Sequence, residues 1–563
     1  MRQLLMPAPE LGGGRANLLL AGFSGTGKSS AGRIAAELLR MPFFDLDEIA
    51  ERRSGQSLPE LFHSCGEASF RELEVALLQD ATQLSGAVIA TGGGAVLHPE
   101  FAVLAKTGVA VVLAASPEEI QSRLAGDAPR PLLASAAAAR IRELLAERAP
   151  AYARAGVELA TAGLEIPEVG ALIADRYRSE QGSRSHPIVV PGPDGDYPVL
   201  VGSGELVNLD QLLRDRLPRS GRVLVISDGA VAGSAGARLE AILASAGRNL
   251  VALTVPAGEF AKELSAVSQL WDEFQSLALD RGDVVVAVGG GAALDAIGFA
   301  AATWGRGVPW VTVPTTVLAM VDASIGGKVA IDRGSAKNAV GAFHHPRLVV
   351  CDPQLLATLP LQVARDGLAE VVKKAVLASP LLLDFLAQPA PPGMKLPQHL
   401  SWLIEQAVRI KAAYVGADPR DQGVRQSLNL GHTYAHGLEA ASDYRVSHGR
   451  AVAVGLVAAS QFGLELGISP SELPPKLEFA LDRLGFAEPL PPLDRARVRA
   501  ALQLDKKRRG GDASFVVPAR GGAALVSGIE LELALAPLWG LLPEADGGTP
   551  ERAAAGSRHQ VAG

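Results

Sequence analysis

The chain has almost no cysteine. Its 563 residues include only Cys65 and Cys351, which lie far apart, so the sequence excludes a disulfide framework and a cysteine-type zinc site and favours a reducing cytoplasm. Long apolar runs are also missing, and Pro7 and Pro9 interrupt the segment where a secretory signal needs an unbroken apolar core, so we expect no membrane partner. An excess of positive charge is absent as well: the net charge of -7 gives no electrostatic reason to expect a nucleic-acid partner.

What is present describes an α/β protein. Hydrophobic residues make up 48% of the chain and charged residues 20%, and the length predicts three or four domains. Strand-like apolar runs bounded by glycine alternate with helical patterns up to about Tyr177 and again from Ile188 to Asp352, which predicts parallel sheets covered by helices. After Cys351 helical patterns dominate. The predicted organisation is an α/β domain at 1–176, a linker at 177–187, a second α/β domain at 188–350, a mainly helical domain at 351–543 and a disordered tail at 544–563.

A phosphate-binding loop follows the first predicted strand. Gly22, four further residues and then Gly27, Lys28 and Ser29 stand between an apolar run and a helical pattern, as a Walker A loop requires. We expect backbone N–H groups and the helix N-terminus to hold phosphate oxygens, Lys28 to contact the transferring phosphate, and the Ser29 hydroxyl to reach Mg²⁺. A chance glycine turn would leave the flanking strand and helix unexplained. The residues predicted to bind ATP here are Gly25, Thr26, Gly27, Lys28, Ser29 and Ser30.

Charged residues downstream of this loop suit a small carboxylated polyol. Asp45 and Asp47 stand at strand spacing, which predicts that both lie at the end of a buried strand beside the phosphate loop. Guanidinium groups can hold a carboxylate and an aspartate can orient a hydroxyl, although each charge taken alone is more typical of a solvated surface. The other members of the set are Arg71, the glycine turn Gly92, Gly93 and Gly94, then Arg130 and Arg148.

In this order the motifs resemble shikimate kinase over Asn17 to about Tyr177. The resemblance implies a P-loop kinase fold, with helices on both faces of a parallel sheet, and transfer of phosphate from ATP to shikimate. It implies that Lys28, Asp47 and Arg130 are catalytic: Asp47 receives the proton of the attacking hydroxyl, and Arg130, on a lid, closes over the phosphates. It further implies Mg²⁺ binding by Ser29 and Asp45, and a shikimate site formed by Asp47, Arg71, Gly92, Gly93, Gly94 and Arg148. Another kinase of this fold, such as gluconate kinase, is the alternative, which the two arginines Arg71 and Arg148 disfavour.

The second half contains a glycine turn of the kind that admits a dinucleotide. Gly289 to Gly291 stands between a strand-like run and a helical pattern, and Asp228 ends an earlier strand, the usual place for a carboxylate that binds a ribose of NAD. Glu370 and Lys373 are three residues apart and share one helical face. Further polar residues of this half are Glu259, Lys262, Asp295, Thr315, Thr316, Asp322, Lys328, Lys337 and Asn338, with Lys506 and Lys507 late in the chain.

Histidines gather between Arg425 and Gly449. His432 and His436 are four residues apart in a helical pattern, so their rings project from one face, and spacing alone predicts this pair as metal ligands. His448 follows after a turn, while Arg425 and Asn429 suit an anionic, hydroxylated ligand. Scattered histidines satisfied within a helix are the alternative, and that reading leaves the neighbouring arginine and asparagine unexplained.

The motifs of this half resemble 3-dehydroquinate synthase over Ile188 to about Pro543. The resemblance implies a Rossmann-like NAD-binding α/β domain followed by a mainly α-helical domain for metal and substrate. It changes the predicted zinc ligands to Glu370, His432 and His448, and turns His436 to the substrate. Implied for NAD are Asp228, Glu259, Lys262, Gly290, Gly291, Asp295, Thr315, Thr316, Asp322, Lys328 and Lys337. Implied for heptulosonate phosphate are Arg306, Asp322, Lys328, Asn338, Lys373, Lys411, Arg425, Asn429, His436 and Lys506, of which Lys328, Lys373, Arg425 and His436 are catalytic.

The implied reaction cyclises 3-deoxy-D-arabino-heptulosonate 7-phosphate to 3-dehydroquinate with release of phosphate. NAD⁺ removes and returns a hydride in each turnover, while Zn²⁺ or Co²⁺ polarises a substrate hydroxyl. A substrate with a carboxylate and a phosphate accounts for so many lysines and arginines in an acidic chain. Together the halves predict a bifunctional cytoplasmic enzyme of the shikimate pathway with small-molecule substrates, which the second resemblance further implies is a homodimer through its synthase half.

Two positions depart from the pattern of 3-dehydroquinate synthase. Leu294 stands where the family usually has glycine and could crowd the glycine turn, and Arg450 stands where the family has glutamate, beside a predicted metal ligand. Another sugar phosphate cyclase is one alternative for this half. A metal-dependent polyol dehydrogenase is a second, although it leaves Lys337 and Asn338 unexplained. For either half, a structural module without catalysis is a third.

Overall fold

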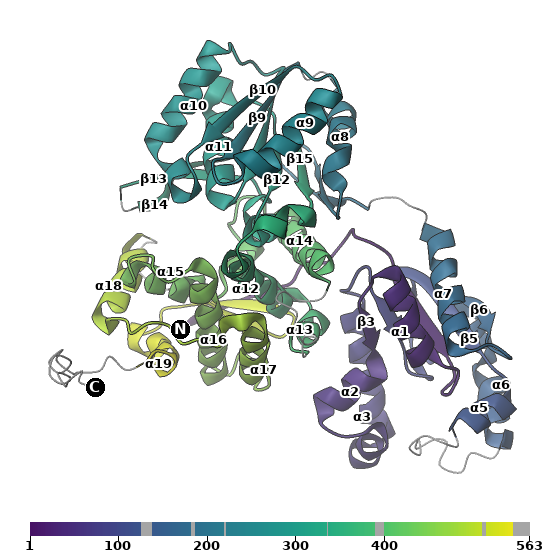
Figure 1. Cartoon of the computed structure of the whole chain (residues 1–563). Helices are drawn as coiled ribbons and strands as arrows, with labels where there is room; N and C mark the ends of the chain where they lie inside the picture. The colour runs from purple at the N-terminus through teal and green to yellow at the C-terminus, as the bar shows by residue number, and fades with distance from the viewer. Residues whose placement is uncertain are drawn as a thin grey trace, which may run out of the picture.

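Three groups of elements follow one another along the chain in Figure 1: an α/β unit, a second α/β unit, and a helical unit with a small sheet. The computed structural model describes residues 1–124, 138–181, 186–218, 221–334, 336–388, 399–508 and 514–543, without the side chains of 504–508. The predicted fold class is confirmed: a P-loop kinase-like parallel sheet, then a Rossmann-like α/β domain, then a mainly helical domain. Arg130, the side chains of Lys506 and Lys507, and the tail 544–563 lie outside the described residues.

The first unit is built on a five-stranded parallel sheet in the order β3-β4-β2-β5-β6. After Asn17 its central strand is apolar, because Leu18 and Leu20 face one hydrophobic core while Leu19 faces the other. The strands are β2 (Asn17–Gly22), β3 (Phe43–Asp45), β4 (Val88–Ala90), β5 (Gly108–Ala114) and β6 (Val157–Ala160). The helices are α1 (Lys28–Leu39), α2 (Leu46–Ser54), α3 (Leu58–Ala81), α4 (Pro99–Ala105), α5 (Pro117–Leu124), α6 (Ala138–Ala155) and α7 (Ile166–Gln181).

The second unit contains a seven-stranded sheet in the order β10-β9-β11-β12-β15-β8-β7, parallel except for β7 at the edge. Its strands are β7 (Ile188–Val190), β8 (Tyr197–Val201), β9 (Val223–Asp228), β10 (Leu250–Val255), β11 (Val284–Gly289), β12 (Trp310–Pro314) and β15 (Leu348–Cys351). A separate hairpin is formed by β13 (Lys328–Arg333) and β14 (Ala336–Phe343). The helices are α8 (Leu209–Arg216), α9 (Ala237–Ser245), α10 (Leu264–Ser276) and α11 (Gly291–Thr303).

The third unit is helical, with one small antiparallel sheet. Its helices are α12 (Leu361–Ala378), α13 (Pro380–Leu386), α14 (Leu400–Ala417), α15 (His432–Ala441), α16 (His448–Glu465), α17 (Leu473–Leu481), α18 (Arg495–Arg508) and α19 (Leu531–Leu541). The sheet has the order β1-β17-β16 and is formed by β1 (Arg2–Pro7), β16 (Ser514–Ala519) and β17 (Gly522–Ser527). In the described ranges, no helix has the combination of length and apolar character that crossing a membrane would require.

The first residues of the chain belong to this third unit. Leu4 of β1 pairs with Leu525 of β17, Met6 is buried there, and the N-terminus lies among the helices of the third unit in Figure 1. The sequence assigned residues 1–176 to a single domain, and that assignment is wrong at its N-terminal end, because β1 completes a sheet whose other strands come at the end of the chain. The linker predicted at 177–187 also begins later, since α7 continues to Gln181 and Tyr177 is buried in the first unit.

Helix α14 joins the first unit to the third. It lies beside the turn that precedes β4, and one hydrophobic cluster runs from Leu19 and Phe44 of the first unit to Trp402 of α14. Trp402 Nε1 and Gln406 Nε2 donate to the carbonyl oxygen of Ser85 at 2.7 Å and 3.0 Å. Arg409 donates from Nε to the Gly13 carbonyl at 2.8 Å and from Nη1 to the Gln83 carbonyl at 3.0 Å. The backbone N–H of Arg15 donates to Glu405 Oε1 at 3.0 Å. Burial lowers the pKa of Arg409 to about 10. The halves therefore share a packed polar and apolar interface.

Replacing Arg409 with leucine is expected to destabilise this interface. The carbonyl oxygens of Gly13 and Gln83 would lose charged donors inside a buried contact, which costs about 2 to 4 kcal/mol. The measurement is the unfolding midpoint in urea, followed by circular dichroism. Arg33→Leu is the matched control, because Arg33 pairs with Glu48 on the exposed surface, where such pairs contribute at most about 1 kcal/mol. Equal midpoints for the two variants would contradict the expectation.

Candidate functional sites

The phosphate loop lies between β2 and α1. Gly25 and Gly27 have φ angles of 83° and 91°, the left-handed region that glycine adopts without strain, and Gly27 precedes the first residue of α1. Lys28 Nζ donates to the carbonyl oxygens of Gly22 at 2.8 Å and Phe23 at 2.9 Å, so the ammonium lies over the loop. Thr26 is buried and its hydroxyl donates to the Phe23 carbonyl at 2.8 Å. The loop and the N-terminus of α1 therefore form a cationic cradle for phosphate.

Asp45 connects this loop to the next helix. Its Oδ2 accepts a hydrogen bond from Ser29 Oγ, and its Oδ1 accepts from the backbone N–H of Asp47 at 3.0 Å. Asp45 thus caps α2, and Asp47 lies in the first turn of that helix. The prediction that both aspartates end a strand is wrong for Asp47, because the capping interaction starts the helix at Leu46. Ser29 and Asp45 offer neighbouring oxygens of the kind that Mg²⁺ prefers.

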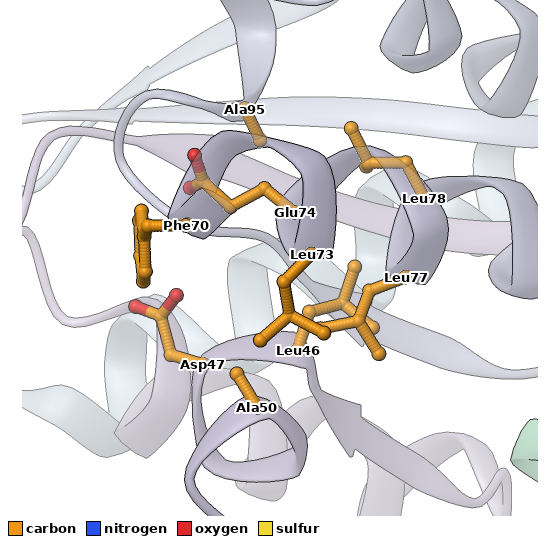
Figure 2. A pocket seen from close by; sticks show the side chains of 10 residues that line it. Leu46, Asp47, Ala50, Phe70, Leu73, Glu74, Leu77, Leu78 and Ala95 are labelled. Carbon is orange, nitrogen blue, oxygen red and sulfur yellow. The ribbon is translucent and has the colours of Figure 1, made fainter. Parts of the chain in front are cut away.

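A pocket lies beside the phosphate loop, where α2, α3 and the glycine turn meet. It is lined by Leu46, Asp47, Ala50, Phe70, Leu73, Glu74, Leu77, Leu78, Gly92 and Ala95. Figure 2 shows the carboxylates of Asp47 and Glu74 at one side of the pocket and the leucines at the other. A Cβ on Gly92 would lie 2.8 Å from Glu74 Oε1 and 2.9 Å from Asp47 Oδ1, so a side chain here would displace the two carboxylates of the pocket.

Two arginines reach the same glycine turn. Arg71 pairs with Glu74, and a Cβ on Gly94 would lie 2.9 Å from Arg71 Nη1. Arg148 Nη1 donates to the Gly93 carbonyl at 3.0 Å, and its buried Nε has no hydrogen-bond acceptor among the described residues. A Cβ on Gly93 would lie 3.1 Å from the backbone nitrogen of Ser24, which places this turn against the phosphate loop. The predicted residues of the first site therefore gather in one place, Arg130 excepted.

Glu74 lines this pocket but was not predicted from the sequence. Its carboxylate holds Arg71 through the ion pair and lies 3.5 Å from His98 Nε2. The signal was available, since Arg71 and Glu74 are three residues apart and so lie on one face of a helix. Glu74 fixes the guanidinium of Arg71 at the pocket.

The predicted dinucleotide residues lie at the carboxyl ends of neighbouring parallel strands. Asp228 ends β9, Gly289 ends β11 and Thr315 follows β12. The backbone N–H of Thr315 donates to the Gly289 carbonyl at 2.9 Å. Gly290 precedes α11, so the positive end of that helix points to the edge where a pyrophosphate would bind. Leu294 does not crowd this turn: it is buried in the hydrophobic core, and the atoms nearest to a Cβ on Gly289, Gly290 or Gly291 belong to other residues.

Paired charges border this edge. Lys262 Nζ lies 2.7 Å from Asp295 Oδ2 and also contacts Asn338 Oδ1. Burial raises the pKa of Asp295 to about 6, against the opposing effect of Lys262. Lys337 pairs with Glu259 and lies 2.8 Å from Asp332. Except for Asp332, all of these residues were predicted to bind NAD or heptulosonate phosphate.

A cavity of about 430 Å³ opens between the second and third units. It is lined by Asp295, Asp322, Ala323, Ile325, Lys328, Val329, Ala330, Asn338, Gly341, Ala342, Phe343, Lys411 and Arg425. Arg425 is buried, with Nη1 donating to the Pro419 carbonyl at 2.9 Å and Nη2 to the Gly326 carbonyl at 3.1 Å. Lys328 pairs with Asp421 at the rim. Three cationic side chains in one cavity suit an anionic ligand.

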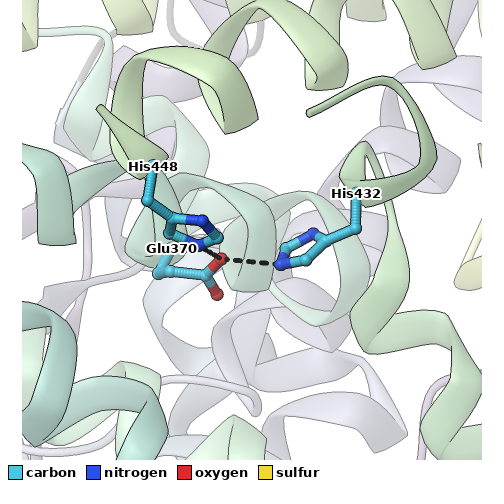
Figure 3. A group of neighbouring side chains, drawn as sticks. All are labelled: Glu370, His432 and His448. Carbon is cyan, nitrogen blue, oxygen red and sulfur yellow. Dashed lines mark ion pairs between the residues drawn. The ribbon is translucent and has the colours of Figure 1, made fainter. Parts of the chain in front are cut away.

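Glu370, His432 and His448 form a candidate metal centre. One ligand atom from each lies within 4.8 Å of the others. Figure 3 shows one oxygen of Glu370 pointing between the two imidazole rings: Oε1 lies 3.4 Å from His432 Nε2 and 3.7 Å from His448 Nε2. This buried oxygen accepts no hydrogen bond from any described residue. A carboxylate oxygen and two imidazole nitrogens that converge in this way fit a divalent metal such as Zn²⁺.

The two imidazoles are held by their other ring nitrogens. His432 Nδ1 lies 3.2 Å from the Leu430 carbonyl, and His448 Nδ1 lies 3.0 Å from Glu439 Oε1, so each Nε2 is left for a metal. Burial, with Lys373 close by, holds the pKa of His432 well below its usual value. Burial would lower the pKa of His448, but Glu370 and Glu439 raise it to about 10, so this position favours positive charge. Glu439 was not predicted, because only the folded chain brings it to His448.

His436 lies beside the centre but outside it. Its ring centroid is 5.7 Å from that of His432, and the residue is exposed. Arg450, the departure next to His448, donates from Nη2 to the Pro489 carbonyl at 2.8 Å. Its guanidinium is thus engaged away from the metal ligands.

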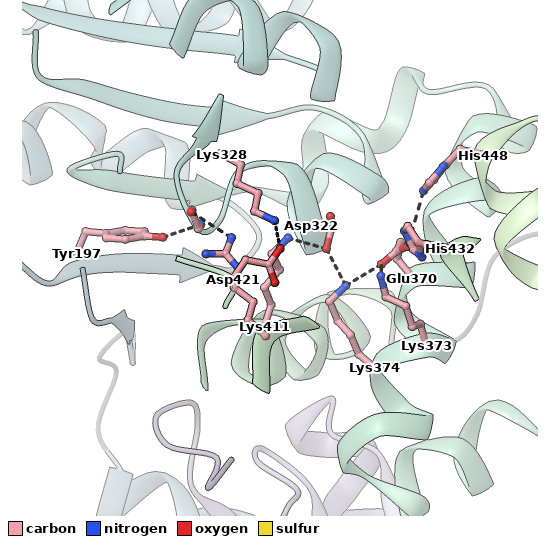
Figure 4. A network of polar contacts seen from close by, with 12 residues as sticks. Tyr197, Asp322, Lys328, Glu370, Lys373, Lys374, Lys411, Asp421, His432 and His448 are labelled. Atoms are coloured by element: carbon pink, nitrogen blue, oxygen red, sulfur yellow. Dashed lines mark hydrogen bonds and ion pairs between the residues drawn. The ribbon is translucent and has the colours of Figure 1, made fainter. Parts of the chain in front are cut away.

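A row of alternating charges connects the metal centre to the cavity. In Figure 4 it runs through Lys373, Glu370, Lys374, Asp322 and Lys411. Burial alone would raise the pKa of Glu370, but the neighbouring ammonium groups outweigh it and lower that pKa well below the usual value. Burial lowers the pKa of Lys411 to about 7, although Asp322 opposes the shift. Lys374 was not predicted, although it stands four residues after Glu370 on one helix; its contact with Asp322 is made only in the folded chain.

Among the described residues, no hydrogen bond or ion pair joins Arg306 or Asn429 to the other predicted residues of the synthase site. Arg306 is exposed in a short helical turn (Trp304–Arg306) and has a φ of 65°. Asn429 ends another turn (Val424–Asn429), three residues before His432, and is partly exposed.

Comparisons with known proteins agree with this division. Family models match as "Shikimate kinase" over residues 24–175, "3-dehydroquinate synthase N-terminal" over 252–366 and "3-dehydroquinate synthase C-terminal" over 367–508. The 3-dehydroquinate synthase of Symbiobacterium thermophilum is 42% identical over 59% of this chain and 93% of its own length.

Solved structures resemble each half. A 2-epi-5-epi-valiolone synthase from Streptomyces hygroscopicus, solved with NAD⁺ and Zn²⁺ bound, is 26% identical with a TM-score of 0.54, over 61% of this chain and 96% of that one. A shikimate kinase from Acinetobacter baumannii, solved with shikimate, is 32% identical over 30% of this chain and 96% of that one, with a TM-score of 0.29. The chain therefore belongs to the 3-dehydroquinate synthase family and is a fusion in which a shikimate kinase precedes the synthase.

Proposed function

We propose that the N-terminal half phosphorylates shikimate with ATP, using the residues gathered at the phosphate loop and the glycine turn. Lys28 and the N-terminus of α1 hold the ATP phosphates, and Ser29 with Asp45 holds Mg²⁺. Arg71 and Arg148 hold the carboxylate of shikimate, and Asp47 accepts the proton of the attacking hydroxyl. The contact between Gly93 and the phosphate loop supports this assignment, because it brings acceptor and phosphate together.

For the C-terminal half we propose the cyclisation of heptulosonate phosphate to 3-dehydroquinate. When bound, NAD⁺ would take up and return a hydride, and a divalent metal on Glu370, His432 and His448 would polarise a substrate hydroxyl. Lys328, Lys411 and Arg425 hold the carboxylate and phosphate in the cavity. The observation that carries this proposal is the row of charges that joins the metal ligands to the cavity. Identity of 42% to a 3-dehydroquinate synthase, against 26% to a valiolone synthase, favours the carboxylated substrate.

The test uses the whole chain for both reactions. Phosphate release from heptulosonate phosphate should require catalytic NAD⁺, disappear after treatment with a chelator, and return with Zn²⁺ or Co²⁺. ATP-dependent phosphorylation of shikimate should require Mg²⁺ and should survive loss of the transition metal. A half that shows no turnover when its metal and cofactor are verified as bound loses its assignment.

His436 and His432 should separate turnover from metal binding. His436→Ala is expected to lower synthase kcat by about 100-fold or more while the zinc content stays at the level of the unmodified chain. His432→Ala should lose both synthase turnover and zinc, because the substitution removes a ring nitrogen that faces Glu370 Oε1. Zinc analysis by atomic absorption beside steady-state kinetics checks this. Equal loss of zinc in the two variants would restore the pairing of His432 with His436 as ligands.

We further propose that the chain acts in the cytoplasm as a homodimer through its synthase half. The dimer rests on the resemblance to the synthase family, and the cytoplasmic location on the scarcity of cysteine. Native mass spectrometry of the purified chain measures the oligomeric state, and a monomer at working concentration would exclude the dimer.

A further inference from the structure

Two carboxylates of the synthase half, the buried Glu370 and the partly exposed Asp322, are each held by a pair of lysines at one oxygen. Glu370 Oε2 lies 2.6 Å from Lys373 Nζ and 3.1 Å from Lys374 Nζ, whereas its Oε1 faces the two histidines. Asp322 Oδ1 lies 2.6 Å from Lys411 Nζ and 3.2 Å from Lys374 Nζ. Lys374 is the member common to both pairs, and its side chain is fully buried.

We propose that Lys374 is a positioning residue that makes Glu370 present a single oxygen to the metal and holds Asp322 at a fixed place beside it. The proposal rests on the proposed metal centre. Lys374 follows Lys373 on α12 and shares the Glu370 oxygen with it, so two ammonium groups lie against Oε2. If the carboxylate turned to offer both oxygens to the histidine side, both ammonium groups would lose their contact with Oε2, and the buried Lys373 would lose its carboxylate partner.

A single-oxygen contact matters for the chemistry of the site. A catalytic metal keeps coordination positions open for substrate, and a two-oxygen contact by Glu370 would fill one of them. Two ammonium groups on the other oxygen also withdraw charge from the carboxylate, so the metal would polarise a substrate hydroxyl more strongly. Because Lys374 also holds Asp322, the substrate groups on the metal and those beside Asp322 keep a constant separation.

A purely structural alternative is that Lys374 only neutralises buried charge. Both readings predict that removal of the ammonium disturbs the fold, but only the positioning role predicts an altered geometry at the metal. The absorption spectrum of bound Co²⁺ distinguishes them, since its intensity falls when the number of ligands increases. This readout does not depend on turnover.

The experiment compares Lys374→Met with Leu377→Met, a substitution of similar size at a buried position of the same helix that makes none of these contacts. For Lys374→Met we expect one Co²⁺ per chain, a weaker visible absorption, and a synthase kcat lowered by about 10- to 100-fold with little change in KM. Leu377→Met should match the unmodified chain in all three. Shikimate phosphorylation should be unchanged in both variants, which reports that the chain is folded.

Lys374→Gln is the second variant, for the case in which the methionine variant does not fold. Glutamine can still donate to one carboxylate but carries no charge, so it should show an intermediate spectrum and an intermediate kcat. An unmodified Co²⁺ spectrum and kcat in a folded Lys374 variant would overturn the proposal. If the unmodified chain binds no Co²⁺, the proposed metal centre fails instead, and the two failures are therefore distinguishable.

Discussion

Glu370→Gln is expected to lower the metal affinity of the synthase half by roughly 100- to 10,000-fold and to abolish its turnover at ordinary metal concentrations. The variant loses the charge of the oxygen that faces His432 and His448, and it leaves Lys373 and Lys374 beside an uncharged amide. A bound metal cation would lose its negatively charged partner, and removing one partner of a buried charge pair costs about 3 to 5 kcal/mol, where each ~1.4 kcal/mol is a factor of ten. The measurement is a titration of the metal-free chain with Zn²⁺ against a competing chelator.

The kinase half of the same molecule supplies the control for this variant. Its site lies in the first unit and shares no residue with the metal centre, so shikimate phosphorylation should continue at the unmodified rate. A parallel loss of phosphorylation would mean that the substitution unfolds the whole chain. A Glu370→Gln variant that keeps Zn²⁺ and turnover would exclude Glu370 as a ligand.

Asp47→Asn is expected to lower the kcat of shikimate phosphorylation by about 100- to 10,000-fold, the usual contribution of a general base. Asparagine keeps the size of the side chain beside Gly92 but cannot accept the proton of the attacking hydroxyl. The affinity for ATP should change little, because Asp47 lies in the first turn of α2 rather than in the phosphate loop. A coupled assay for ADP, with ATP affinity from fluorescence titration, measures both quantities.

Glu48→Gln is the matched control on the same helix. Glu48 is the next residue, and its carboxylate pairs with Arg33 on the exposed surface, so this variant should phosphorylate shikimate normally. Synthase turnover should be unchanged in both variants. A normal kcat in Asp47→Asn would assign the proton to another acceptor, and Glu74 across the pocket would then be the first to test.

The sequence predicted best what depends on neighbouring residues. The phosphate loop requires only a strand, a glycine-rich turn and a helix in succession, and the structure contains all three at the expected residues. The prediction that Asp47 ends a strand was wrong, and the reason is also local. Strand spacing from Asp45 suggested a continued strand, but the side chain of Asp45 bonds to the backbone of Asp47 and begins a helix.

Residues joined by long-range contacts were harder to predict. Glu439 reaches His448 from a separate helix and Lys374 meets Asp322 across two units, so no local pattern identifies these two contacts, although Lys374 also stands four residues after Glu370 on one helical face. Glu370 and Lys373 were predicted from a resemblance and from helical spacing, yet the division of the two Glu370 oxygens between metal side and lysine side is visible only in the folded chain. The contacts of Arg409 with the first unit are also made between residues far apart in the sequence, so they were not predicted either.

The pairing of β1 with β17 affects the order in which the chain can fold during its synthesis. Strand β1 is made more than five hundred residues before its partner β17, since Leu4 pairs with Leu525. At roughly 5 to 20 residues per second, the strand waits on the order of 25 to 100 seconds for that partner. The kinase sheet, which begins at Asn17, can complete itself on the ribosome during this interval, while the exposed Leu4 and Leu5 of the unpaired strand remain available to a chaperone. The closing of β1 onto β17 therefore comes late in folding, because it joins two segments that are made far apart in time.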